Sequence, residues 1–293
     1  MPAAEVDVSV SLVRKLLEAQ HPDIARLPLE VIANGWDNVV CRLGDDLIVR
    51  LPRREVAAQL VLHEQRWLPI LAPRVPLPIP APVRVGHPSD DYPWPWSVVP
   101  YLSGRSAAED PPEDLRAAAI SVGTFLGKLH APAPPDAPIN PFRGIRLADR
   151  RATLAGRIAS LAGVIDQAAA SRALENAVAV PPWRQPPVWL HGDFHPHNIL
   201  VTDGAVSGVI DFGDLTSGDP ATDLAIAWML LPAAHRADFR TAYETANGTG
   251  IDADTWARAA GWGLAFALAF LANSADNPLM AGIGGGALAA VLA

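Results

Sequence analysis

Two short blocks near residue 200 contain the residue types that phosphoryl transfer requires. The first is HGDFHPHN at positions 191–198, which has the form H-x-D-x-x-x-x-N, and the second is DFG at positions 211–213. A phosphoryl group in transit is dominated by negative charge, so a protein contributes mainly positioning and electrostatic neutralisation. Two carboxylates and a carboxamide in this order and separation therefore indicate phosphoryl transfer.

Each of the three polar residues has a predicted task. Hard oxygen ligands suit Mg²⁺, so Asn198 and Asp211 are the predicted magnesium ligands. Asp193 is the predicted general base, which orients the acceptor hydroxyl and accepts its proton. Short strands predicted at residues 187–190, 199–201 and 206–210 would hold these side chains on the loops between them.

The same residues also have other readings. Asp and Asn in loops are commonly turn formers or helix caps. His191, His195 and His197 form an H-x-x-x-H-x-H pattern, which offers a zinc hydrolase as an alternative. The five remaining histidines lie in unrelated settings, so no obvious motif completes a zinc site.

A resemblance adds to this reading. The block at residues 191–198, followed by VIDFGD at 209–214 and GDPATDLA at 218–225, resembles the aminoglycoside phosphotransferase family of small-molecule kinases. In that family Gly follows the His of the catalytic loop, and Gly192 matches it. The resemblance extends from about residue 29 to about residue 228.

The resemblance implies a fold and a set of site residues. The fold is α+β and two-lobed, like a protein kinase, with a small β-rich N-lobe (1–102), a hinge (97–104) and a larger, mostly helical C-lobe (105–293). The N-lobe would bind the nucleotide, and the C-lobe would hold the catalytic residues and the acceptor. The residues implied are the catalytic base Asp193, the magnesium ligands Asn198 and Asp211, and the supporting residues His191 and Asp223.

The first hundred residues carry the pattern of a nucleotide-binding lobe. A helix at 11–19, strands at 29–33, 39–43 and 47–51, and a helix at 55–71 are predicted from periodicity and turn residues. The turn at 34–38 would by its position cover the phosphates. Asn34 and Gly35 are therefore predicted nucleotide contacts.

The third of these strands departs from the kinase pattern. A protein kinase has a Lys there, paired with a Glu on the following helix, but the only lysines of this chain are Lys15 and Lys128. Arg50 occupies the matching place, and Glu64 is its predicted partner. Arg can neutralise phosphate and form a bidentate carboxylate pair. A similar Arg-Leu-Pro-Arg run occurs in macrolide phosphotransferases.

The segment WSVVPYLSG at 96–104 resembles the hinge of such a fold. Backbone groups of Val99 and Tyr101 are predicted to bind the purine edge. Pro100 between them lacks an N–H.

Beyond the hinge the sequence is mostly helical. Helices are predicted at 112–130, at 146–178 with a break near Gly163, and at 235–246, 252–272 and 278–292. Asp219 is predicted to cap a helix that starts at Pro220. Gly284 to Gly286 would interrupt the last helix. Asp214 and Asp219 are candidate acidic neighbours of the acceptor.

Composition limits the partners and the location. Residues 1–105 carry 11 basic and 12 acidic residues and residues 106–293 carry 12 and 19, which disfavours nucleic acid and suits a polycationic acceptor. The longest apolar run, 263–272, is too short to span a membrane. A single cysteine, Cys41, and the absence of a signal segment favour the cytoplasm.

The sequence therefore predicts a Mg²⁺-dependent O-phosphotransferase that uses ATP or GTP. Its predicted acceptor is a hydroxyl of a small molecule, first an aminoglycoside-type antibiotic, which would give resistance by modification. One alternative acceptor is a macrolide or another hydroxylated metabolite. An alternative of a different class is a nucleotide-binding pseudoenzyme, which only the missing strand lysine supports.

Overall fold

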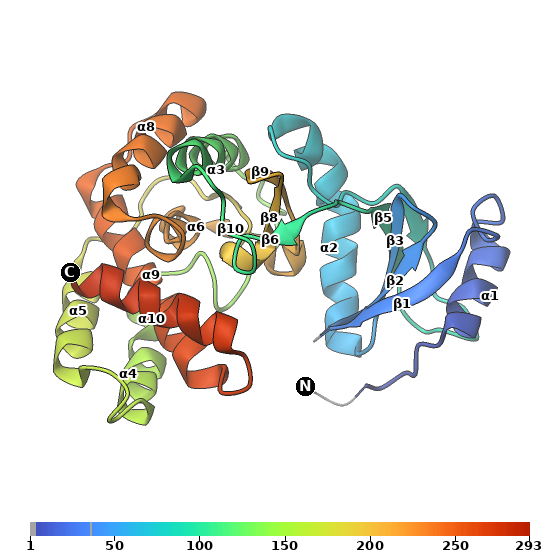
Figure 1. Ribbon diagram of the computed structural model, residues 1–293, viewed down its shortest axis with the longest axis horizontal. Coiled ribbons are helices and arrows are strands. Elements are labelled where there is room, and N and C mark those ends of the chain that lie inside the picture. Colours follow the sequence, from blue (N-terminus) through green and yellow to red (C-terminus); the bar gives the residue numbers. More distant parts are fainter. Residues whose placement is uncertain (1–3, 36) are drawn as a thin grey trace. The chain divides into compact units, whose positions relative to one another are not determined.

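The chain divides into two compact units. The computed structural model describes residues 4–35 and 37–293 (Figure 1). Unit 1 runs up to Arg74 and continues from Pro78 to Ser103, and unit 2 comprises Val75–Leu77 and Gly104–Ala293. The division at Ser103 falls inside the segment in which the sequence predicts a hinge.

Unit 1 is an antiparallel sheet flanked by two helices. The strand order is β1-β2-β3-β5-β4. The strands are β1 (Leu29–Asn34), β2 (Asn38–Leu43), β3 (Leu47–Pro52), β4 (Arg84–Gly86) and β5 (Trp96–Pro100), and the helices are α1 (Val10–Gln20), α2 (Glu55–Leu71) and the 3₁₀ turn η1 (Ala72–Arg74). Helices α1 and α2 cover opposite faces of the sheet (Figure 1).

Side-chain alternation along β3 explains the two faces. Val49 and Leu51 are fully buried in a cluster that includes Leu17 of α1. Because successive side chains of a strand point to opposite faces, Arg50 between them points to the other face. There it meets Glu64 of α2.

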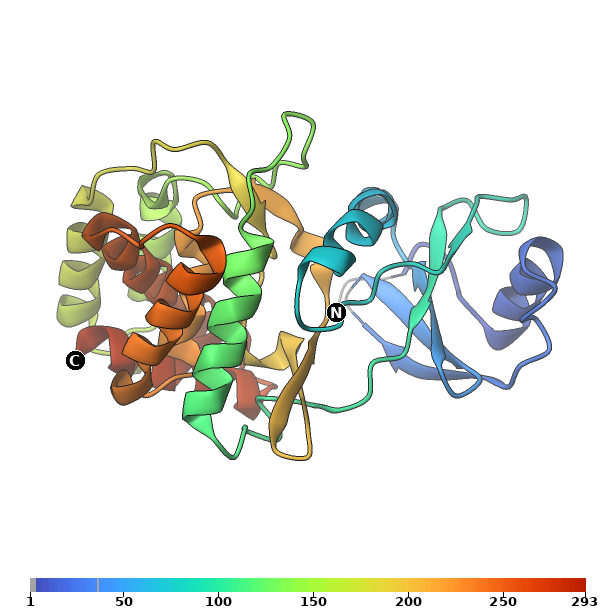
Figure 2. The same ribbon diagram turned by 90° about the horizontal axis from the view of Figure 1, so that it is seen from above.

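Unit 2 is mostly helical and contains two small sheets. Its helices are α3 (Leu115–Leu129), α4 (Arg151–Ser160), α5 (Gln167–Ala179), α6 (Ala221–Leu224), α7 (Ile226–Met229), α8 (Arg236–Asn247), α9 (Ala253–Asn273) and α10 (Pro278–Leu292). Its strands are β6 (Arg105–Ser106), β7 (Val188–Leu190), β8 (Ile199–Thr202), β9 (Ala205–Val209) and β10 (Thr216–Gly218). Its 3₁₀ turns are η2 (Leu147–Arg150), η3 (Pro196–Asn198), η4 (Phe212–Asp214) and η5 (Ala233–His235). Helices α3 and α8 lie side by side (Figures 1 and 2).

Helix α9 forms the core of unit 2. It packs against α4, α5, α6, α7 and α10. Among the described residues it is the one helix long and apolar enough to cross a membrane, but 67% of its apolar window is buried inside the protein. That burial is typical of a core helix.

The structure refines two predicted helices. The region predicted at 146–178 is divided into η2, α4 and α5, and Gly163 lies in the break with a φ of +77°. The glycines at 284–286 do not interrupt α10. A Cβ on Gly284 would lie 3.0 Å from Leu271 Cγ, so this glycine allows α10 to approach α9 closely.

The two sequence blocks connect the same two strand pairs. β7 pairs with β10, and β8 pairs with β9. Residues 191–198 lead from β7 to β8, and residues 210–215 lead from β9 to β10. The two loops therefore start and end at neighbouring strands, which brings the blocks together.

Candidate active site

His191 joins the two blocks. Its Nε2 donates to the carbonyl of Ile210 at 2.9 Å, and its Nδ1 accepts from the amide of Asp193 at 3.3 Å. Its buried ring packs against Phe212, with 4.5 Å between the ring centroids. Both ring nitrogens are thus engaged in holding the first loop against the end of β9, as expected of a supporting residue.

Asp223 holds the backbone of the first loop from inside the protein. Its carboxylate is fully buried and accepts hydrogen bonds from the amides of His191 at 2.7 Å and Gly192 at 3.0 Å. His130 Nε2 lies 3.2 Å from the same carboxylate, and His130 Nδ1 lies 3.0 Å from the hydroxyl of Tyr243. These contacts show that Asp223 holds the backbone of the loop, and its supporting role in catalysis stays a prediction; no motif pointed to His130 or Tyr243.

Glycine is required at position 192 for steric reasons. Its φ is +87°, a conformation that residues with a side chain rarely adopt. A Cβ at this position would lie 2.2 Å from the carbonyl oxygen of Asp214. The loop can therefore approach the segment after DFG only with glycine at this position.

The Asp193 carboxylate lies between the side chains of Arg143 and His195. Arg143 Nη2 donates to its Oδ1 at 2.9 Å, and His195 Nε2 lies 3.2 Å from its Oδ2. Burial alone would raise the pKa of Asp193, but the hydrogen bond and charge of His195, together with Arg143, hold this pKa below its ordinary value. The side chain is 27% exposed, so an ionised carboxylate is accessible to an acceptor hydroxyl.

Asn198 and Asp211 present the oxygen atoms that the sequence assigns to a metal. The Asn198 side-chain amide donates to the carbonyl of Asp193 at 2.9 Å, which leaves its Oδ1 as a possible ligand. Asp211 is exposed and has a φ of +62°, a strained conformation that clusters at functional sites. The Asn198 carbonyl accepts from the amide of Ile210, the residue before Asp211, at 2.9 Å.

This donor set suits Mg²⁺ better than zinc. One carboxamide oxygen and a carboxylate are hard ligands of the kind that Mg²⁺ takes in phosphate-transfer sites. Within the described residues, no group of three or more His, Cys, Asp or Glu side chains could hold a metal ion. The zinc hydrolase therefore has no ligand set in this part of the chain.

Arg143 is a site residue that sequence reasoning missed. Besides bonding Asp193, its guanidinium lies over the ring of Phe266 at 4.8 Å. Nearby, Asn140 Nδ2 donates to Asp214 at 2.5 Å. Burial and the charge of Asp193 raise the pKa of Asp214. The segment around Arg143 thus adds polar contacts to both aspartates.

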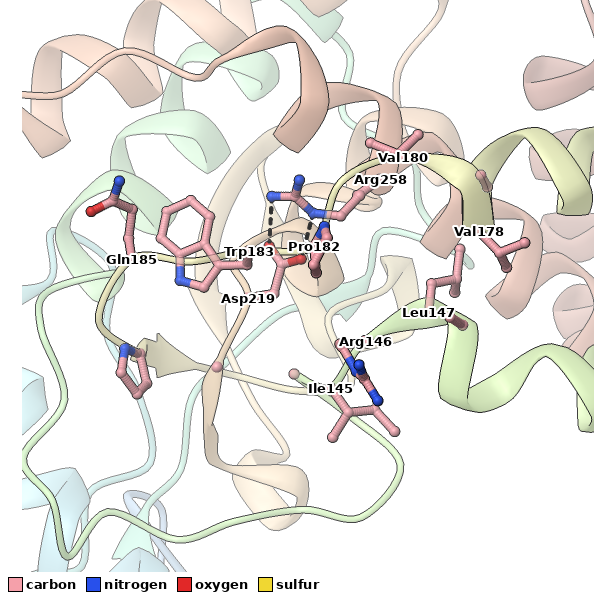
Figure 3. A pocket seen from close by; sticks show the side chains of 15 residues that line it. Ile145, Arg146, Leu147, Val178, Val180, Pro182, Trp183, Gln185, Asp219 and Arg258 are labelled. Atoms are coloured by element: carbon pink, nitrogen blue, oxygen red, sulfur yellow. Dashed lines mark hydrogen bonds and ion pairs between the residues drawn. The ribbon is translucent and has the colours of Figure 1, made fainter.

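Asp219 does not lie free beside an acceptor, contrary to what was expected. Arg258 Nε donates to its Oδ2 at 2.6 Å, and both side chains are buried. The pair borders a cavity of about 240 Å³ whose wall also includes Trp183 and Ile145. Figure 3 shows Asp219 and Arg258 facing each other in this cavity. Asp219 therefore serves an internal ion pair.

In unit 1, the predicted ion pair is present. Arg50 Nη1 lies 3.0 Å and 2.9 Å from the two carboxylate oxygens of Glu64. The Glu64 side chain is 2% exposed and that of Arg50 is 12% exposed. A Glu held in this way fixes the guanidinium next to the sheet.

The turn between β1 and β2 is anchored at its base. The amide of Gly35 donates to the carbonyl of Asn38 at 2.9 Å, and Arg53 Nη1 donates to the carbonyl of Gly35 at 3.1 Å. Asn34 is the last residue of β1. Trp36, in the same turn, lies outside the described residues. The position of Arg53 was not predicted.

The hinge prediction needs one correction. Val99 lies on β5 opposite Ile48 of β3. The Tyr101 amide donates to the carbonyl of Asp46 at 2.8 Å. This amide is therefore used within unit 1 and does not bind a purine, so Tyr101 can contribute only its carbonyl group.

Comparisons with known proteins agree with this geometry. Residues 28–262 match the model of the phosphotransferase enzyme family. No curated protein matches the chain. The solved GDP complex of aminoglycoside 2'-phosphotransferase-IIIa is 20% identical, with a TM-score of 0.67 over 95% of this chain and 97% of that chain.

Two further solved structures have the same fold. Macrolide 2'-phosphotransferase MphH from Brachybacterium faecium is 22% identical, with a TM-score of 0.62 over 96% of this chain and 97% of that chain. The streptomycin–ATP complex of APH(2")-IIa is 18% identical, with a TM-score of 0.59 over 90% of this chain and 91% of that chain. The predicted α+β, kinase-like fold is confirmed. The chain belongs to the phosphotransferase enzyme family, and its reaction is the transfer of a phosphoryl group to an alcohol group.

Proposed function

We propose that this enzyme transfers the γ-phosphoryl group of a nucleoside triphosphate to a hydroxyl of a small molecule, with Asp193 as the general base. The observation that carries this proposal is the Asp193 loop. Asp223 and His191 fix its backbone, and its carboxylate stays accessible beside Asn198 and the DFG segment.

The Asp193 carboxylate would first orient the acceptor hydroxyl and would receive its proton late in the reaction. It accepts a hydrogen bond from the acceptor hydroxyl and so points the oxygen at the γ-phosphorus. As the new O–P bond forms, the bond to the β–γ bridging oxygen breaks, the nucleoside diphosphate leaves, and the hydroxyl proton passes to Asp193. A carboxyl with a lowered pKa is ionised at neutral pH but is a weak base, so its contribution is mainly orientation.

Asn198 and Asp211 would hold Mg²⁺. When bound, the ion would neutralise phosphate charge. Asp211→Ala should weaken magnesium-dependent nucleotide binding, measured by titration with and without Mg²⁺. Unchanged affinity with unchanged metal dependence would contradict the assignment of Asp211 as a ligand.

Unit 1 would bind the nucleotide. Arg50 would meet the phosphates, the turn with Asn34 and Gly35 would cover them, and backbone groups of Val99 and the Tyr101 carbonyl would meet the base. Solved structures of the same fold are named as complexes with GDP or with ATP, which supports a nucleotide donor of either kind.

The acceptor has two antibiotic candidates. An aminoglycoside is the acceptor that the sequence favours, and solved proteins of this fold are named as kanamycin and streptomycin complexes. A macrolide is the second candidate: the rings of Phe266 and Phe270 lie next to Arg143 and His195, and apolar walls suit such an acceptor. Phosphorylation of either would give resistance by modification.

The test is magnesium-dependent consumption of ATP and of GTP across aminoglycosides, macrolides and other hydroxylated compounds. Stimulation by one class identifies the acceptor. Asp193→Ala should abolish that stimulation and leave nucleotide affinity within a few-fold, because Asp193 acts on the acceptor. Asp254→Asn, an exposed carboxylate on α9, is the matched control. Undiminished turnover by Asp193→Ala would refute the general base, and nucleotide binding without any turnover would favour a pseudoenzyme.

A further inference from the structure

Arg143 is the first of three arginines spaced seven residues apart. Arg150 ends η2 and Arg157 lies two turns further on, in α4. Arg143 itself lies in the loop before η2, and α4 packs against α9, which carries the Phe266 ring beneath Arg143. All three arginines are half-buried. We call this set the arginine row.

The arginine row has few counter-charges. Arg143 is paired with Asp193 at 2.9 Å, and its Nε is buried without a hydrogen-bond partner. Arg150 lies over the ring of Phe142 at 5.2 Å. In the described part of the chain, neither Arg150 nor Arg157 forms an ion pair or a side-chain hydrogen bond.

The arginines of the row also repel one another. Burial lowers the pKa of Arg150, and the charges of Arg157 and Arg143 lower it further. Burial and the charge of Arg143 lower the pKa of Arg157 in the same way. Three partly buried cations with a single carboxylate partner form an arrangement that a bound anion would relieve.

We propose that the arginine row binds an anionic group of the acceptor, a carboxylate or a phosphate, while the acceptor hydroxyl meets Asp193. This inference rests on the proposed function. Arg143 touches the carboxylate that receives the hydroxyl, and Arg157 lies two helical turns from Arg150, a rise of roughly 10 Å. The acceptor would then be a small molecule that carries a hydroxyl at one end and an anionic group at the other.

The same charges act against a polycationic acceptor. An aminoglycoside would place its ammonium groups next to the guanidinium groups, and like charges in contact lower affinity. The Asp214 carboxylate is held by Asn140. The arginine row therefore changes the expected acceptor from a cationic to an anionic hydroxyl compound.

The binding test uses inorganic sulfate as the probe. Thermal unfolding is followed with sodium sulfate and with sodium chloride at equal ionic strength, for the wild type, for Arg150→Gln/Arg157→Gln, and for the control Arg172→Gln. Arg172 is exposed on α5, outside the row. We expect sulfate to bind roughly tenfold more weakly to the double variant and with unchanged affinity to the control. Equal sulfate affinity in the double variant and the wild type would overturn the proposal.

A second experiment distinguishes an anion site for the acceptor from an anion site for the nucleotide phosphates. The sulfate titration is repeated with a saturating non-hydrolysable ATP analogue and Mg²⁺. If sulfate still binds, the anion site is separate from the nucleotide site and is available to the acceptor. Sulfate binding that the analogue removes would assign the arginines to the γ-phosphate and overturn the acceptor inference.

Turnover gives the third arm. Glucose, glucosamine and glucuronate share a ring skeleton and differ in charge, and they are compared beside the antibiotic panel. With any anionic acceptor, Arg150→Gln/Arg157→Gln should raise the acceptor KM and leave kcat nearly unchanged. Turnover of a polycation that the double variant performs equally well or better would overturn the inference but leave the proposed function intact. Nucleotide consumption that persists in Asp193→Ala would instead overturn the proposed function.

Discussion

Replacing Asp223 with Asn tests whether the catalytic loop is held from inside the protein. The side chain keeps its size and shape, so packing is preserved. What changes is the hydrogen bonding of a carboxylate that is fully buried and accepts from the amides of His191 and Gly192 and from His130.

The size of the effect follows from those contacts. The carboxylate receives hydrogen bonds at 2.7, 3.0 and 3.2 Å. Asn retains one acceptor oxygen and turns an NH₂ toward another donor, which removes a charge-assisted hydrogen bond and leaves a buried donor unpaired. Each loss costs about 1.5–3 kcal/mol, so the free energy of unfolding should fall by about 3–6 kcal/mol. That is a large part of the stability of a typical domain. The variant should therefore be studied at low temperature, where it should still fold.

Activity should fall as well. A displacement of the Asp193 carboxylate by about 1 Å can cost on the order of 100-fold in rate, and kcat should decrease by that order. Nucleotide affinity should change little because Asp223 contacts the backbone of the loop and His130, and neither contact involves a predicted nucleotide-binding residue. Urea unfolding followed by circular dichroism, with steady-state kinetics, measures both effects, and Asp254→Asn is the exposed control. An unfolding free energy within about 0.5 kcal/mol of wild type with an unchanged kcat would refute the reasoning.

Three further outcomes are expected. Gly192→Ala should lose most turnover and unfold at a lower temperature, because its Cβ would lie 2.2 Å from the Asp214 carbonyl oxygen; wild-type kinetics would contradict this. Arg50→Gln should weaken nucleotide affinity at least about tenfold, or about 1.4 kcal/mol, whereas the exposed Arg26→Gln should not; equal affinities by titration would exclude Arg50 from the phosphates. Cys41 should stay unreactive in the native state at pH 8, since burial raises its pKa to about 11 and the thiolate is the reactive form; rapid labelling by a thiol reagent before unfolding would contradict this.

Local spacing made much of the fold predictable from the sequence. The strands of unit 1 follow from alternating apolar residues and turn residues, and the Arg50–Glu64 pair follows from a side chain on β3 and a helix that comes directly after it. The supporting roles of His191 and Asp223 were implied by the family resemblance, and the structure shows that Asp223 contacts the backbone of His191. The break near Gly163 was predicted from the sequence, and this glycine has a positive φ between α4 and α5.

The missed features depend on contacts between distant parts of the chain. Arg143 reaches Asp193 across 50 residues and His130 reaches Asp223 across 93, and no motif encodes such pairs. Asp219 looked available to an acceptor because Arg258, its partner, lies 39 residues away. The use of the Tyr101 amide likewise depends on a backbone contact to Asp46 that only the folded sheet supplies.

The segment from Asn140 to Leu147 has a consequence for how this enzyme could diversify. Asn140 contacts Asp214, Arg143 contacts Asp193, and Gly144 and Leu147 border the cavity beside Asp219, yet none of these residues belongs to the HGD or DFG blocks. Mutations in this stretch can therefore change the polarity around Asp193 and Asp214 while the phosphoryl-transfer residues stay intact. A duplicated copy of the gene could acquire a new acceptor through a handful of substitutions in one short stretch of sequence.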